Sequence, residues 1–275
     1  MQKLNLKILA AFLLVLTHLL LVTSCKDDNS PTGPEQQQEE VQEPVMPPTN
    51  SMKIDLSDFL GNRKSGLAKA PVLSKQNFGM AVVTTTVLNT WVVVGLSVPV
   101  AIFARALQET PALESDAKFH WRYTELGYEV DLVGWIDIQN KQTVWEMYVT
   151  HLSNLDHFLW YSGRANLDAT AGDWLFYDIS QPATQVEIIK IDWVNNSETD
   201  RQLAFTNVLV NTENYGDILK YTVKDDDRKI EFHDSAKDED LIIYWDAVTT
   251  AGYFQAPDYK DGLPAYWDEN HDDVP

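Results

Sequence analysis

From Lys118 almost to the end of the chain, apolar and polar residues alternate with a period of two. Phe119 and Trp121 open this pattern, which returns in about ten separate runs, the last of them ending at Trp245. A period of two is typical of strands that bury one face and expose the other. The turns between the runs are too short for crossovers, so neighbouring strands should pair antiparallel. The sequence therefore predicts a mainly β fold, in which residues 117–255 form one antiparallel meander sheet, curled or bent into a half-barrel.

The preceding segment, residues 51–110, has a helical pattern instead of this alternation. Its long apolar run permits a transmembrane helix over Val82 to Ala104, although threonines and a proline interrupt the run. We expect two buried helices, or a strand and a helix, separated near Gly95 to Pro99 and packed on the sheet. Phe103 would then belong to the core. The alternative is that the segment forms a lid over a ligand cavity.

The first 24 residues have the composition of an export signal. Two lysines and no acid precede an apolar run from Ile8 to Val22, which is too short to span a bilayer comfortably. The following Val22-Thr23-Ser24-Cys25 resembles the bacterial lipobox, in which small residues precede a cysteine that has received diacylglycerol. The resemblance implies that residues 1–24 are a signal peptide and that Cys25, the only cysteine, carries acyl chains such as palmitate. These chains would anchor the protein in a membrane.

The residues after this cysteine carry a second resemblance. Lys26, Asp27 and Asp28 are similar to the surface-export signal of lipoproteins in Bacteroidota-like bacteria, a lysine and two acids directly after the lipidated residue. This implies recognition by the lipoprotein processing and export machinery and a place in the outer membrane, on the cell surface. Residues 25–50 are rich in Pro, Gln and Glu and have few large apolar residues, so we expect a disordered tether.

Residues 51–275 are long enough for one domain with a substantial core. The net charge of −20 argues against nucleic acid as a partner, because the phosphates would be repelled. The last part, residues 256–275, mixes aromatic and acidic residues. Tyr266 and Trp267 could pack across one end of the sheet, whereas we expect a disordered acidic tail from Asp268 onward.

Nine tryptophans are present, and most of them fall in the predicted strands. Trp and Tyr suit the buried side of a pleated sheet, so we expect most of these tryptophans in the core. Trp135 is the exception, because it shares its parity with Asp131 and Asp137 and is opposite to Leu132 and Ile136. It should point to the more polar face, where it could bind a glycan or an apolar ligand.

Signatures of catalysis and of metal binding are largely missing from the sequence. His151 and His157 lack the spacing of a zinc site, and the acids at 225–227 and 238–240 lack an EF-hand pattern. No nucleophile motif or phosphate loop occurs, and no cofactor is implied. Glu146 and Asp192, each beside a strand tryptophan, are the first candidates for a glycosidase pair, which needs two carboxyl groups about 5–9 Å apart.

Helices before a long meander resemble, in architecture alone, the open half-barrels of lipoprotein carriers in the bacterial envelope. No residue motif accompanies this likeness, so it carries no function. We expect a lipid-anchored cell-envelope protein that acts without catalysis, by binding or by structural contact. The alternative is a carbohydrate-binding or carbohydrate-active surface lipoprotein.

Overall fold

The computed structural model describes residues 41–60, 74–151 and 155–275, and Val41–Pro275 form one compact unit. The predicted signal peptide, the predicted lipidation site Cys25 and the predicted export signal Lys26, Asp27 and Asp28 lie outside the described residues. The tether prediction is covered only from residue 41 onward.

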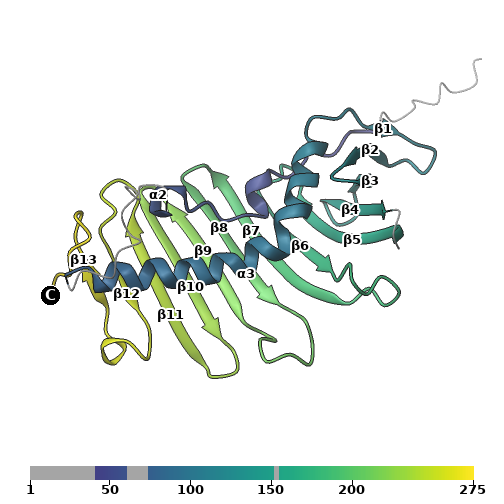
Figure 1. The fold of residues 1–275 in the computed structure, drawn as a ribbon. Coiled ribbons are helices and arrows are strands. Elements are labelled where there is room, and N and C mark those ends of the chain that lie inside the picture. The colour runs from purple at the N-terminus through teal and green to yellow at the C-terminus, as the bar shows by residue number, and fades with distance from the viewer. Residues whose placement is uncertain (1–40, 61–73, 152–154) are drawn as a thin grey trace, which may run out of the picture. The chain divides into compact units, whose positions relative to one another are not determined.

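A single open sheet of thirteen antiparallel strands dominates the unit, and the strands follow one another in chain order (Figure 1). The mainly β meander is therefore confirmed, although the pattern indicated fewer strands. The three strands that the pattern missed are the shortest ones, two at the C-terminal end and one at the N-terminal end, where few residues are left to alternate. The strands are β1 (Ala112–Leu113), β2 (Phe119–Glu125), β3 (Tyr128–Asp137), β4 (Gln142–His151), β5 (Leu155–Asn166), β6 (Ala171–Tyr177), β7 (Glu187–Ser197), β8 (Asp200–Asn207), β9 (Ile218–Lys224), β10 (Asp227–Asp234), β11 (Glu239–Asp246), β12 (Gly252–Gln255) and β13 (Ala265–Trp267).

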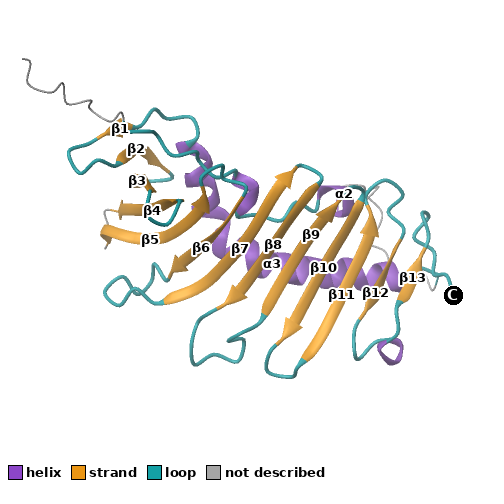
Figure 2. Ribbon diagram, turned by 180° about the vertical axis from the view of Figure 1, so that it is seen from behind, coloured by secondary structure: helices purple, strands orange, loops and turns teal. Residues whose placement is uncertain are grey.

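One long helix, α3 (Gln76–Ala106), crosses one face of this sheet, and the short helices η1 (Thr49–Ser51) and α2 (Ser57–Leu60) lie on the same side (Figure 1). Figure 2 shows the opposite face without a helix over it. We call these the covered face and the bare face. A further short helix, η2 (Lys260–Gly262), lies between β12 and β13.

The two halves of α3, Gln76–Thr90 and Gly95–Ala106, are bent by 65° relative to each other. Pro99 lies inside the helix and removes a backbone donor to the turn at Gly95, which accounts for a bend near this point. The sequence placed a break at Gly95 to Pro99 between two separate elements, whereas the structure has one bent helix. In the described part of the chain no single helix passes as a membrane span by length and composition, and the two halves do so only as a bent pair.

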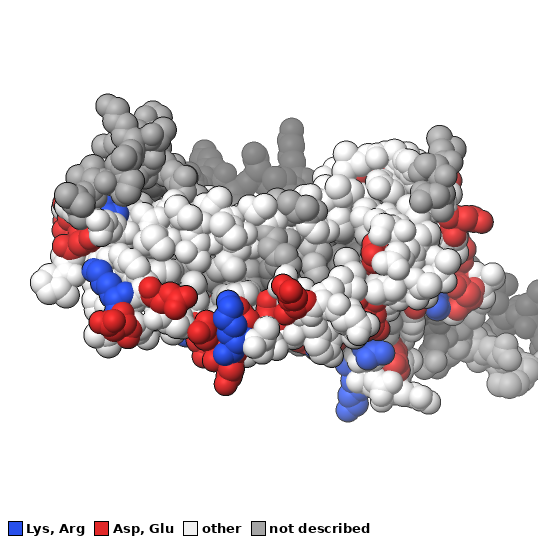
Figure 3. Space-filling model, turned by 60° about the horizontal axis from the view of Figure 1, so that its bottom comes forward, with Lys and Arg blue, Asp and Glu red and all other residues white. Residues whose placement is uncertain are grey.

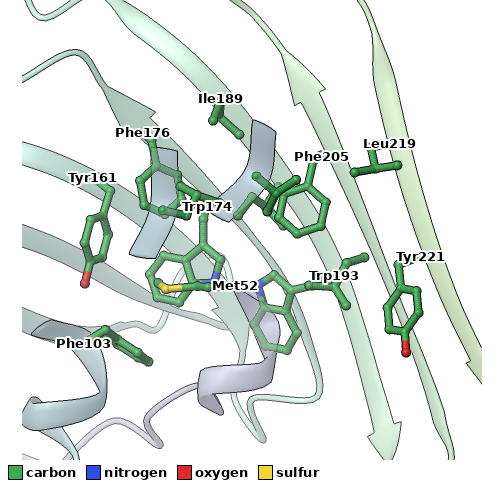
Figure 4. Close-up of a cluster of buried hydrophobic side chains, with 14 of the residues drawn as sticks. Met52, Phe103, Tyr161, Trp174, Phe176, Ile189, Trp193, Phe205, Leu219 and Tyr221 are labelled. Atoms are coloured by element: carbon green, nitrogen blue, oxygen red, sulfur yellow. The ribbon is translucent and has the colours of Figure 1, made fainter. Parts of the chain in front are cut away.

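Both halves of α3 are embedded in the core of the covered face. Phe78 is 2 % exposed and Phe103 is fully buried, with its ring 5.4 Å from that of Trp174 at 68°. Figure 4 shows Phe103 and Met52 pointing at the aromatic side chains of the sheet. The prediction that this segment packs on the sheet is confirmed. On the opposite side of α3, Val83 and Val87 are exposed, and Figure 3 shows an uncharged band beside mixed acidic and basic side chains.

Tryptophans of the covered face lie flat over glycines of the neighbouring strand. Gly134 pairs with Trp145, and Gly163 pairs with Trp174. A Cβ atom added at Gly163 would lie 2.2 Å from Trp174 Cε3, closer than real atoms approach. A glycine at this position is therefore what allows the indole to lie on the sheet.

The segment before α2 is part of the same core. Pro44 and Pro47 are buried, and the Trp174 indole donates a 3.0 Å hydrogen bond to the Ser51 hydroxyl. Farther along, Arg228 donates to Asp58 at 3.0 Å. The tether prediction over residues 25–50 therefore extends too far, because residues from 44 onward pack against the sheet. Pro44 and Pro47, which the composition places in a solvated chain, are instead buried.

The C-terminal residues also pack against the helix, so the prediction of a disordered tail from Asp268 is wrong. Backbone N–H groups of Gln76 and Asn77, in the first turn of α3, donate to the Asp273 carboxylate. The His271 ring stacks on Phe78 with centroids 3.7 Å apart. The N-cap residue, Lys75, makes no capping bond with its side chain, and Asp273 accepts from the first turn in its place. The composition of the tail does not indicate this contact between residues almost 200 positions apart.

Candidate functional site

Trp135 points to the bare face, as its parity predicts. Among the tryptophans whose side chains the structure describes, it alone is not buried. Seven others lie in the core with exposed fractions of 6 % or less, which confirms the prediction for most strand tryptophans. Among these tryptophans Trp135 therefore offers an aromatic surface on the bare face, which makes it the centre of a candidate site.

A shallow depression of about 610 Å³ surrounds this indole on β3, β4 and β5. Trp135 is the only aromatic side chain that lines it, and the rest of the lining is mainly polar. The other lining residues are Asp137, Asn140, Gln142, Val144, Glu146 and Arg164. The depression therefore combines one aromatic surface with amide, carboxylate and guanidinium groups.

The strand register builds this arrangement. Trp135 lies opposite Val144 on β4, and Val144 lies opposite Arg164 on β5, so the three side chains form one row across the bare face. The Lys118 ammonium lies 3.7 Å from the centroid of the Trp135 ring. A cation over one face of the indole fixes the orientation of the ring and takes up that face.

Hydrogen bonds hold the carboxylates of the depression in place. The Asn140 amide donates to Asp137 at 2.7 Å, and hydrogen bonds from the Asn140 side chain and backbone hold the pKa of Asp137 below its usual value. Tyr148 donates to Glu146 at 3.0 Å. Burial and the adjacent Glu146 carboxylate raise the pKa of Tyr148 to about 12, so this hydroxyl remains a donor at neutral pH. Both acids thus act as fixed acceptors.

The suggested glycosidase pair does not face across a common site. Glu146 lies on β4 and Asp192 on β7, which are separated by three strand spacings, about 14 Å. Asp192 instead lies opposite Asp173, which in turn lies opposite Arg164. Burial raises the pKa of Asp173, and the Asp192 carboxylate acts in the same direction, while Lys190 and Arg164 oppose it.

A network of charged side chains borders the depression on β2 and β3. Asp131 accepts a 3.1 Å hydrogen bond from Arg122 Nε and lies 2.9 Å from His120 Nδ1. Glu114 also accepts hydrogen bonds from the Arg122 guanidinium. Because these groups bond to one another, the network stabilises the pairing of β2 with β3. It therefore has a structural role and does not account for the exposure of Trp135.

The candidate metal ligands of the sequence lie apart. The His151 ring lies 5.0 Å from Tyr128, and the His157 ring is stacked 4.3 Å from Tyr148. Residues 225–227 and 238–240 lie at hairpin turns of the sheet. Within the described ranges no group of three His, Cys, Asp or Glu side chains is placed to hold a metal ion.

Comparison with known proteins adds no relative: no protein-family model matches the chain, and neither a curated protein nor a solved structure is similar to it. The site must therefore be interpreted from its own geometry. Sequence reasoning found Trp135 by parity but missed Arg164 and Gln142 as its neighbours. The sequence pattern shows that both residues point outward. It does not show that they lie beside Trp135, because the register of β3, β4 and β5 is set by turns and bulges.

Proposed function

We propose that this protein is a non-catalytic carbohydrate-binding lipoprotein of the bacterial cell envelope, with Trp135 at the centre of its binding site. The observation that carries the proposal is a partly exposed indole surrounded by Gln142, Glu146 and Arg164 on a face without a covering helix. A sugar ring offers C–H groups on its flat side and hydroxyl groups at its rim. The indole face that Lys118 does not cover suits the first, and the fixed polar groups suit the second.

Two features favour binding over catalysis. Glycoside hydrolysis needs two carboxyl groups on opposite sides of the bond, one of them with a raised pKa. In the depression Asp137 has a lowered pKa, and the acid with a raised pKa, Asp173, lies two strands away from Glu146. These acids are better placed to accept hydrogen bonds from hydroxyl groups than to transfer protons.

An apolar carrier is the competing interpretation, since helix and meander together resemble the carriers of the envelope. Such a carrier would need space between α3 and the sheet. Phe103, Met52 and Trp174 occupy that position and are at most 1 % exposed (Figure 4). The packing of these side chains supports a structural role for the covered face and a binding role for the bare face.

Binding should be measured on the full chain in zwitterionic detergent, which presents no sugar groups, against a panel of neutral oligosaccharides. We expect Trp135→Ala to weaken binding about tenfold or more, through loss of the stacking surface. Ile138→Ala, on an 80 % exposed side chain just outside the depression, is the matched control and should leave binding unchanged. Equal affinity of wild type and Trp135→Ala would contradict the proposed site.

The proposed location in the cell envelope depends on residues that precede the described unit, above all on Cys25. If Cys25 carries the anchor, Cys25→Ser should abolish incorporation of a palmitate analogue and release the protein from the membrane fraction after a carbonate wash. If the mutant stays in the washed membranes, another segment holds the protein there, and α3 would be the first segment to test.

Surface exposure is a separate part of the proposal, because it rests on Lys26, Asp27 and Asp28. Replacing all three with alanine should leave lipidation intact but protect the protein from protease added to whole cells. If accessibility is unchanged, these residues are only part of the tether.

A further inference from the structure

Three tyrosines stand side by side on the bare face at the C-terminal end of the sheet. Tyr244 on β11 lies opposite Tyr253 on β12, which lies opposite Tyr266 on β13. The ring centroids are 5.4 Å apart in the first pair and 5.5 Å apart in the second. The first two rings are nearly parallel, with 21° between their planes. We call these three residues the tyrosine ladder.

The ladder forms one wall of a second depression, of about 450 Å³. Its outermost member, Tyr266, is 43 % exposed, and Tyr244 and Tyr253 are half-buried. Asp246 and the last residues of the chain, Val274 and Pro275, line the same space. Three aromatic rings therefore lie at the surface in one row, on the face opposite to buried neighbours such as Trp245 and Phe254.

Polar groups accompany the rings. The Tyr244 hydroxyl donates to the Asp227 carboxylate, which orients that ring. Lys229 lies opposite Tyr244 on β10, and its ammonium group is 3.0 Å from a Glu231 oxygen. The ladder therefore has apolar ring faces, with carboxylate and ammonium groups at its border.

This combination favours carbohydrate over other ligands. Tyr244 and Tyr253 partly cover each other's faces, so the exposed parts of the rings, largest at Tyr266, are what can attract the C–H side of sugar rings. The bordering charged groups can bond to hydroxyl groups. The acids beside the ladder and the net charge of −20 would repel an acidic polymer, so the complementary ligand is a neutral glycan. A ladder across three strands covers about 10 Å, which suits several linked sugars better than one.

We propose that the tyrosine ladder is a second carbohydrate site, which binds a neutral glycan chain across β11, β12 and β13. The ladder is distinct from the Trp135 site, because β3 and β11 are eight strand positions apart, roughly 35–40 Å along the sheet. One extended glycan, or two separate ones, could then be held on the same bare face. Each site stands on its own contacts, so either proposal can fail alone.

The test uses the full chain carrying Trp135→Ala, so that the first site is removed, and measures binding of linear neutral oligosaccharides. Binding that is weaker than that of the wild type by about tenfold or more should persist in this background, and it should fall about a further tenfold when Tyr253→Ala or Tyr266→Ala is added. Tyr253→Phe keeps the ring and should bind nearly as well as the parent. Tyr215→Ala removes a 53 % exposed tyrosine outside the ladder and serves as the control. Unfolding curves of all variants establish that each is folded.

Three results would overturn the ladder proposal. The first is loss of all glycan binding in the Trp135→Ala variant alone, which supports the Trp135 site and refutes the ladder. The second is residual binding that neither ladder variant changes. The third is preference for an acidic polysaccharide or a proline-rich peptide over neutral glycans. Conversely, full affinity in Trp135→Ala with loss in the ladder variants supports the ladder and removes the Trp135 site.

Discussion

The two faces of the sheet are built from the same strands but differ in almost every physical respect. On the covered face, alternate residues such as Trp121 and Trp174 are 2 % exposed or less and pack under α3. On the bare face, the residues between them include the partly exposed Trp135 and Tyr253, surrounded by hydrogen-bonded charges. The period of two therefore separates the residues that fill the core from those at the surface. One parity is buried under α3, and the other leaves aromatic side chains partly exposed on the bare face.

The largest effect is expected on the covered face. Phe103→Ala should lower the free energy of unfolding by about 3–5 kcal/mol, because it leaves a cavity beside Trp174. Val83→Ala, on the exposed side of the same helix, should change it by less than about 0.5 kcal/mol. Chemical denaturation of both variants checks this contrast. Similar small losses in both would mean that α3 does not pack tightly.

A second substitution on the covered face should act in the opposite direction. The Tyr161 hydroxyl is fully buried and has no hydrogen-bond partner among the described residues, and burial raises its pKa well above the usual value. Tyr161→Phe removes an unsatisfied polar group and should stabilise the protein by about 1 kcal/mol. A loss of stability in denaturation would show that a partner, such as a bound water, satisfies this hydroxyl.

A moderate effect is expected where the C-terminal tail holds α3 over the covered face. Asp273→Ala removes the carboxylate that accepts from Gln76 and Asn77 and should cost about 1 kcal/mol. Glu269→Ala removes an exposed acid of the same tail and is the control. Equal melting temperatures for the two variants would show that the cap does not stabilise the helix.

The smallest effect is a pH dependence at the same contact. Burial holds the pKa of His271 below 6.5, with Lys75 acting in the same direction and Asp268 and Asp272 opposing. The neutral ring is favoured in the folded state, so this contribution is complete above about pH 6.5 and is lost as the pH falls through the lowered pKa. Stability of the wild type should therefore decline more steeply between about pH 7 and 5 than that of His271→Ala. Parallel curves would contradict this.

The division into two faces could be predicted from the sequence because burial acts on every second residue. Local pattern alone predicts that Trp135 lies on the polar face. It indicates a core position for Phe103 but leaves a lid over a cavity as the alternative. Pairings between distant segments were not predictable in this way. Asp273 reaches the start of α3 from the other end of the chain, and a terminal run of acids resembles a solvated tail when its partner is unknown.

The sites show the same limit. The alternation that ends at Trp245 indicates that Tyr244 points outward, but only the strand register places Tyr253 and Tyr266 beside it. Of the two C-terminal aromatics expected to pack on the end of the sheet, Trp267 is buried, whereas Tyr266 is 43 % exposed. β12 and β13 have four and three residues, too few for alternation to be visible. Two of the three ladder residues, Tyr253 and Tyr266, therefore lie on strands that the pattern left out. The Trp135 depression was only partly predicted, because Arg164 joins it across two strand pairings.

Hydrogen exchange of α3 tests most directly whether the covered face is a core and not a lidded cavity. If α3 is part of the core, its amides should exchange within about tenfold of those in β7 to β10, through opening of the whole domain. Phe103→Ala should then accelerate both sets together. Exchange of α3 about a hundredfold faster than the strands, with the sheet still protected, would mean that the helix opens by itself. The covered face would then be the place to look for a ligand.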